Sequence, residues 1–158
     1  VQGRTVMFKY FVPVIVVLSL LPASAASADF SNALKGKEIK ALISGNTAEG
    51  QRYKEGKGIL SGIQQDVMFR TYFSPDNSLV EKSDGGAQSV GHVAAHGKWQ
   101  LKKKALCITW SDALTDSGRM KCFKVIPKGD GAYGLYTKQG QLNRTWNRVR
   151  SGNPHNLE

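Results

Sequence analysis

The chain has 158 residues and carries 22 lysine and arginine residues against 12 aspartate and glutamate residues, for a formal net charge of +10. This length suits one domain with a single core, and the positive charge favours solubility and anionic partners without selecting a fold. The two cysteines have no further ligands nearby at the spacing that a structural metal centre requires, so no metal or other cofactor is expected.

The N-terminal segment has the layout of a secretory signal peptide. Two basic residues precede an apolar run at residues 10–21, and the small-residue sequence PASAASA follows it. A membrane anchor is the competing interpretation, but a span needs about 20 apolar residues, and Pro13 interrupts this shorter run. We expect residues 1–28 to be cleaved near Ala28. Two basic residues and no acidic one leave with them, which gives a periplasmic or secreted protein of net charge +8 without a transmembrane segment.

The convincing helical pattern of the mature chain lies at residues 30–47. Its apolar residues recur near the 3.6-residue period of a helix: Leu34, Ile39, Leu42 and Ile43. Ser31 or Asn32 can cap the start, and Gly45 stands where a left-handed residue commonly ends a helix. A helix this short is unstable alone, so we expect it to pack against the rest of the domain.

Downstream of this helix, short strand patterns alternate with turn signals about every 8–12 residues. The expected strands are residues 66–73, 78–83, 92–101, 105–110, 119–126, 132–137 and 141–150. This spacing is typical of an antiparallel sandwich or barrel. We predict an all-β fold, a small antiparallel barrel of roughly seven or eight strands with one short N-terminal helix as a plug or lid. The domain covers residues 29–150, and the polar tail at 151–158 is expected to be disordered.

Cys107 and Cys122 are expected to form a disulfide, because an even cysteine count in an exported chain argues for pairing. If the two cysteines are directly opposite on antiparallel strands, the register of neighbouring residues follows. It pairs Leu106 with Phe123, Ile108 with Lys121, and Trp110 with Arg119. The apolar pair beside the bridge makes this a sensible hairpin. The closed loop of about 15 residues is worth roughly 3 kcal/mol in the chain-entropy model.

Several segments together resemble a known family. They are EIKALISGNTAEG at 38–50, YFSPDNS at 72–78, GKW at 97–99, LCITW at 106–110 and CFKV at 122–125. The pattern resembles small exported proteins of rhizobia and related alphaproteobacteria that are known only as a domain of unknown function. The likeness covers most of residues 34–137 and implies a lipocalin-like or calycin-like β-barrel with a disulfide. It implies no activity or catalytic residues. Asn77 stands where the family usually has glycine, a minor departure because asparagine also tolerates positive φ.

No motif in the sequence specifically indicates a catalytic or metal-binding site. His92 and His96 would share one face of a helix, but on the expected strand they lie about 13 Å apart, too far for one ion. Asp112 and Asp116 fall in a polar loop, where solvated turn residues are the ordinary expectation. The glycines of residues 129–134 precede a strand and indicate a hairpin turn, because a phosphate-binding loop opens a helix. We therefore expect the protein not to be an enzyme.

The sequence LNRTWNRVR at 142–150 carries the candidate ligand site. Strand alternation puts five side chains on one face: Leu142, Arg144, Trp146, Arg148 and Arg150. In one interpretation the arginines line a cavity mouth and bind a carboxylate, a phosphate or a lipopolysaccharide head group. In the other, Asn143, Thr145 and Val149 point inward and the arginines face water. The candidate binding residues are Arg144, Trp146 and Arg148.

The expected function is therefore non-catalytic binding of a small or anionic ligand in the cell envelope, by a monomer. The first alternative is an inhibitor or adaptor that docks on an envelope protein through loops 84–91 or 111–118. A hydrolase without a recognisable motif is a further alternative. Basic grooves with aromatic side chains also bind single-stranded nucleic acid, but export argues against that partner. A hollow barrel would support ligand storage, and a filled one with an exposed aromatic patch would support a protein partner.

Overall fold

The computed structural model describes residues 30–55, 64–84, 92–112 and 118–157. The expected signal peptide at 1–28 lies outside these residues, as does most of each loop considered for docking. Within the described part of the chain, no helix has the length and apolar character that crossing a bilayer requires.

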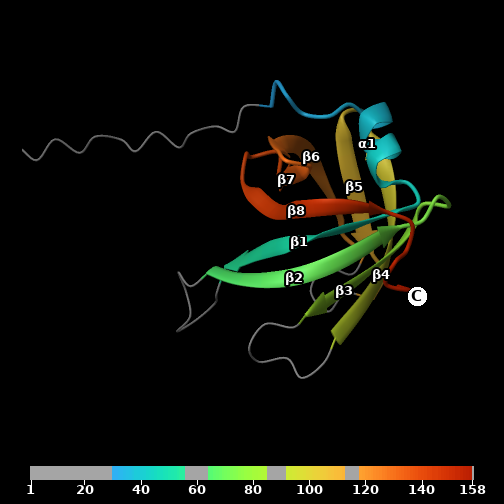
Figure 1. The fold of residues 1–158 in the computed structure, drawn as a ribbon. Helices are drawn as coiled ribbons and strands as arrows, with labels where there is room; N and C mark the ends of the chain where they lie inside the picture. Colours follow the sequence, from blue (N-terminus) through green and yellow to red (C-terminus); the bar gives the residue numbers. More distant parts are fainter. Residues whose placement is uncertain (1–29, 56–63, 85–91, 113–117, 158) are drawn as a thin grey trace, which may run out of the picture.

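Eight antiparallel strands close into a barrel in sequence order, and the last strand pairs with the first (Figure 1). The elements are α1 Gly36–Ile43, β1 Asn46–Glu55, β2 Gln64–Phe73, β3 Ser78–Asp84, β4 His92–Lys102, β5 Ala105–Trp110, β6 Met120–Gly129, β7 Ala132–Tyr136 and β8 Leu142–Ser151. This confirms the predicted antiparallel barrel with one short helix and removes the sandwich alternative. Because each strand pairs with its sequence neighbour, the barrel has the up-and-down topology.

The strand that the sequence analysis missed is β1. It pairs with β2 on one side and with β8 on the other, so it is the strand that closes the barrel. Its inward positions carry Ala48, Gly50 and Arg52, and Thr47 on the other face is buried as well. None of these is a large apolar residue, so the hydrophobic alternation that identifies a half-buried strand is absent from this segment.

Gly50 lies close against the backbone of β8, beside a β-bulge. Glu49 is opposite Arg148 and Gly50 is opposite Trp146, so Asn147 is an extra residue on β8. A Cβ atom on Gly50 would overlap the backbone oxygen of Thr145. The strand therefore requires glycine at this position.

Replacing Gly50 by alanine is expected to lower the free energy of unfolding by about 1–3 kcal/mol, the usual cost of overpacking. The added methyl group must push β1 away from β8 at the seam of the barrel. Urea denaturation followed by circular dichroism measures the loss. Gln51→Ala is the matched control, because its side chain lies on the other face of the same strand, and it should change the stability by less than about 0.5 kcal/mol. Equal effects of the two variants would contradict the prediction.

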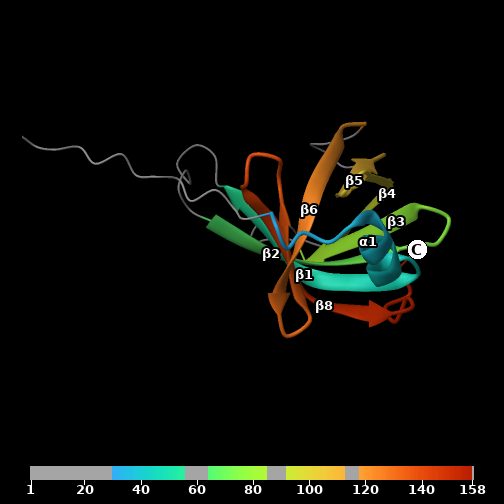
Figure 2. The same cartoon turned by 90° about the horizontal axis from the view of Figure 1, so that it is seen from above.

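The core lies inside the barrel and is covered at one end by α1 (Figure 2). Ile39 and Ile43 of α1 are fully buried in it. The helix is shorter than predicted, and Lys35 is the N-cap residue in place of Ser31 or Asn32. Gly45 has a φ of 75°, as its predicted left-handed role requires.

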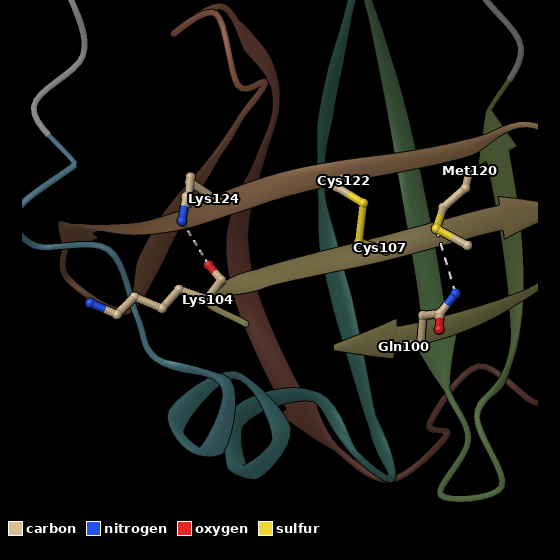
Figure 3. Close-up of a disulfide and its surroundings, with 6 residues drawn as sticks. All are labelled: Gln100, Lys104, Cys107, Met120, Cys122 and Lys124. Atoms are coloured by element: carbon tan, nitrogen blue, oxygen red, sulfur yellow. Dashed lines mark hydrogen bonds between the residues drawn. A yellow bond between two sulfur atoms is a disulfide. The ribbon is translucent and has the colours of Figure 1, made fainter. Parts of the chain in front are cut away.

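The disulfide and its register are confirmed (Figure 3). The two sulfur atoms are 2.07 Å apart, and Cys107 is directly opposite Cys122. The ladder runs from the Leu106–Phe123 pair to the Thr109–Met120 pair and so ends one residue before the expected pairing of Trp110. Leu106 and Phe123 are buried in the core, whereas Cys122 is exposed on the outer face.

The C-terminal segment, which was expected to be a disordered tail, makes specific hydrogen bonds as far as Leu157. Thr47 Oγ1 donates a hydrogen bond of 2.7 Å to the carbonyl of Gly152. Asn153 binds the backbone N–H and C=O of Leu157, each at 2.9 Å. Leu157 is buried. The composition of this segment is polar, but the Asn153 side chain closes a turn with Leu157.

Candidate functional site

The five alternate side chains of β8 do not share one face, so that expectation is wrong. Two bulges leave Asn143 and Asn147 as extra residues, one opposite β7 and one opposite β1. Arg144 and Trp146 between the bulges are buried, with exposed fractions of 4% and 0%. Arg148 beyond the second bulge is exposed. Arg144 and Trp146 therefore point inward, whereas Arg148 faces water, and anion binding by these residues stays a prediction.

Arg144 is held in a buried ion pair inside the barrel. Its Nη1 lies 2.8 Å from Oε2 of Glu81 on β3, and both side chains are about 95% or more buried. Thr71 on β2 donates a hydrogen bond of 2.8 Å to the same carboxylate oxygen. Arg52 on β1 approaches the other oxygen at 3.5 Å. Four adjacent strands thus converge on one carboxylate, which satisfies a charge that would be very costly if left alone.

Aromatic rings enclose the Arg144 guanidinium. Its Cζ lies 4.9 Å from the centroid of the Phe69 ring and 6.0 Å from that of Phe123, within the range of cation–π attraction. Nε donates to Oδ1 of Asn143 at 3.3 Å. The remaining terminal nitrogen, Nη2, has no acceptor in the described part of the chain. A fixed, largely desolvated cation therefore retains donor capacity.

Trp146 has a buried indole N–H without an acceptor among the described residues. Its ring makes edge contacts with Phe73 at 5.7 Å and with Tyr133 at 6.4 Å between centroids. Trp99 provides a contrast, because its indole N–H donates to the backbone oxygen of Ser74 at 3.0 Å. Buried indole N–H groups usually have an acceptor, and leaving one unsatisfied costs about 1–3 kcal/mol.

Sequence reasoning found Arg144 and Trp146 but missed their partners. Glu81 lies within a predicted strand, two residues after the buried Leu79. An acidic residue at an inward position was the signal that could have identified it, because such a charge needs an internal counter-charge. Alternation along the predicted strand 66–73 puts Phe69 and Thr71 on one face, but nothing in the sequence showed that this face meets Arg144.

Arg148 belongs to a separate cluster on the outer surface. Its Nε lies 3.3 Å from Glu49, and Arg150 and His155 lie 3.1 and 2.6 Å from the same carboxylate. Burial raises the pKa of Glu49, but the hydrogen bond from His155 and the charges of the two arginines outweigh it and hold this pKa below its usual value. The structure therefore separates Arg148 from Arg144 and Trp146.

His96 forms a second exposed pair, with Asp112. Its Nδ1 lies 2.6 Å from one carboxylate oxygen, and its backbone N–H donates to the other at 2.6 Å. These hydrogen bonds hold the pKa of Asp112 below its usual value. Ser111 Oγ donates to the backbone carbonyl of His96, which is not the contact of a nucleophile with its base. In the described ranges, no three His, Cys, Asp or Glu side chains are grouped to hold a metal ion. Asp116 lies outside those ranges.

The fold places the protein in the class of closed, up-and-down eight-stranded β-barrels, here with one buried ion pair in an apolar interior. Comparison of the chain with protein-family models, characterised proteins and solved structures finds no match. The resemblance to the exported family of unknown function stays a prediction.

Proposed function

We propose that this protein is a non-catalytic binding protein of the cell envelope that holds a small amphipathic anion inside its barrel. The proposal depends on two groups on the inward face of one strand. One is a buried cation with spare donor capacity, and the other is a buried N–H without an acceptor. These groups are Nη2 of Arg144 and Nε1 of Trp146. Export and the oxidising compartment are supported by the signal-peptide pattern and by the disulfide.

The ligand chemistry follows from the groups that surround these donors. A carboxylate offers two acceptor oxygens and the charge opposite to that of a guanidinium. Phe69, Phe123 and Tyr133 lie beside these donors, so the apolar remainder of a bound anion would pack against their rings. Eight-stranded barrels are filled by side chains or hold one small ligand, which limits the size of the anion. Because Glu81 and Asn143 already orient Arg144, little ordering is needed on binding.

Octanoate, octanol and octylamine test the proposal, because they share an alkyl chain and differ in head group. We expect octanoate alone to stabilise the protein, by about 2.7 kcal/mol when its concentration reaches 100 times its Kd. Thermal unfolding measures this effect. Native mass spectrometry of protein purified from its own host should also show a bound anion. Equal stabilisation by octanol would contradict an anion-specific site.

Two variants test whether the anion binds inside the barrel. Trp146→Phe keeps a buried ring but removes the N–H donor, and should weaken octanoate binding by about tenfold or more, because hydrogen bonds to charged groups are worth about 1.5–3 kcal/mol. Arg148→Gln removes a cation on the outer face and should leave the affinity unchanged. Titration calorimetry distinguishes the two. If Arg148→Gln weakens binding as much as Trp146→Phe, the anion binds outside the barrel.

A further inference from the structure

A surface at the α1 end of the barrel carries a concentration of lysines from three segments, which we call the lysine face. It comprises Lys35, Lys37 and Lys40 of α1 and its N-cap, Lys102, Lys103 and Lys104 of the β4–β5 turn, and Lys124 of β6. All are exposed except Lys124, which is half-buried. The lysine face is independent of the interior site around Arg144.

Backbone contacts hold the three segments together. A Cβ atom on Gly36 would lie 3.1 Å from the carbonyl oxygen of Lys103, so the first turn of α1 rests against the β4–β5 turn. Lys40 is one helical turn after Gly36 and therefore lies on the same side of α1. Lys124 Nζ donates to the carbonyl of Lys104 at 3.4 Å (Figure 3), so β6 is held against the β4–β5 turn.

The charge of the lysine face is strongly one-sided. Glu38 is the one acidic residue in α1, the β4–β5 turn and β6. Its carboxylate accepts a hydrogen bond of 2.6 Å from the backbone N–H of Lys35 and is used as a helix cap. The lysine face therefore has seven ammonium groups and one carboxylate. Every cation of the lysine face is a lysine, whereas Arg144 and Arg148 pair with carboxylates elsewhere.

The backbone of Lys103 gives an independent indication that charge is needed here. Its φ of 55° lies in the left-handed region, which favours glycine or asparagine in a tight turn. A long side chain at this position costs stability that glycine would not. The lysine supplies a positive charge at the exposed tip of the turn, between two further lysines.

We propose that the lysine face docks on the surface of a bilayer that contains anionic phospholipids. Lysine carries a compact, hydrated charge and suits a diffuse layer of head groups, whereas bidentate recognition of single phosphates favours arginine. The large exposed hydrophobic residues in the described ranges are Met68 and Met120, and neither belongs to the lysine face. Tyr136, directly opposite Lys124, is half-buried and packs edge-on against Phe30, so among the described residues no fully exposed ring borders the lysine face for the base stacking that single-stranded nucleic acid uses.

Docking in this way orients the barrel. The lysine face lies at the end where β4 passes into β5, beside α1. The membrane-bound barrel therefore turns its α1 end towards the bilayer.

Sedimentation with lipid vesicles tests the proposal on the full chain. The vesicles contain phosphatidylcholine alone or phosphatidylcholine mixed with phosphatidylglycerol, at about 0.15 M salt. We expect binding to the mixed vesicles to be much stronger, and to fall as salt is raised. Each lysine near an anionic surface contributes about fivefold in affinity, so K102Q/K103Q/K104Q should weaken binding on the order of 100-fold. All variants carry the same N-terminal segment, so its own contribution cancels between them.

The matched control is K82Q/K98Q/K138Q, which removes the same charge from other parts of the surface and should bind within about threefold of the unchanged protein. K103G removes one charge from a turn that glycine fits, so it should weaken binding about fivefold without loss of thermal stability. Equal losses for the two triple variants would overturn the proposal. So would displacement from the vesicles by a single-stranded DNA oligonucleotide at equal phosphate concentration, which would point to nucleic acid instead.

Discussion

Replacing Arg144 by methionine is expected to lower the free energy of unfolding by about 3–5 kcal/mol. The substitution leaves the Glu81 carboxylate buried in an apolar interior without its closest cation, which lies 2.8 Å away in the intact protein. Arg52 is more distant, at 3.5 Å, and partly exposed, so it offsets only part of the cost. Equilibrium unfolding in urea, followed by circular dichroism, measures the change.

Removing both members of the pair separates this electrostatic cost from lost packing. Arg144→Met combined with Glu81→Met should recover most of the stability, because replacing a buried ion pair by apolar residues of similar size is often neutral or stabilising. Arg148→Met on the outer surface should change the stability by no more than about 0.5 kcal/mol. If the double variant is as unstable as Arg144→Met alone, the arginine stabilises the barrel by packing and the ion-pair account is wrong.

Removing the disulfide is expected to lower the free energy of unfolding by about 3 kcal/mol. Cys107 and Cys122 are 15 residues apart, and their link limits the conformations of the unfolded chain. It also fixes the register of β5 and β6, which flank part of the apolar core. The variant is Cys107→Ala with Cys122→Ala, because changing one cysteine alone would leave a reactive thiol.

Chemical reduction provides the control for this prediction. The intact protein in a thiol reductant should unfold at nearly the same urea concentration as the double alanine variant, and the variant itself should not respond to the reductant. Without reductant, the free energies of unfolding of the intact protein and the double alanine variant should differ by the full amount of about 3 kcal/mol. Identical midpoints without reductant would show that the bridge contributes nothing to stability.

The most accurate sequence predictions rested on strong local patterns. The segment 105–110 was predicted with the bounds of β5, and the cysteine pair gave the register of β5 with β6, including Leu106 opposite Phe123. Alternating or continuous apolar residues identify a strand without knowledge of its neighbours. A cross-strand disulfide adds a long-range constraint that is readable from the sequence.

The errors arose where strand pairing across the barrel decides the outcome. β1 lacks large inward apolar residues because Gly50 lies against β8 and Arg52 meets Glu81. The bulge at Asn147 turns Arg148 outward. No local sequence pattern predicts this bulge, because a bulge depends on how two strands pair. The pairing of Arg144 with Glu81 joins residues 63 positions apart.

The sequence by itself determined the class of fold, the short helix, the covalent link between Cys107 and Cys122, and a strongly basic chain, because these follow from periodicity, composition and cysteine count. Only the tertiary structure decided that Arg144 and Trp146 face inward while Arg148 faces water, and which carboxylate neutralises each arginine. The physical reason is that closing the barrel brings distant strands into register. Burial and charge pairing are properties of that register and of no single segment.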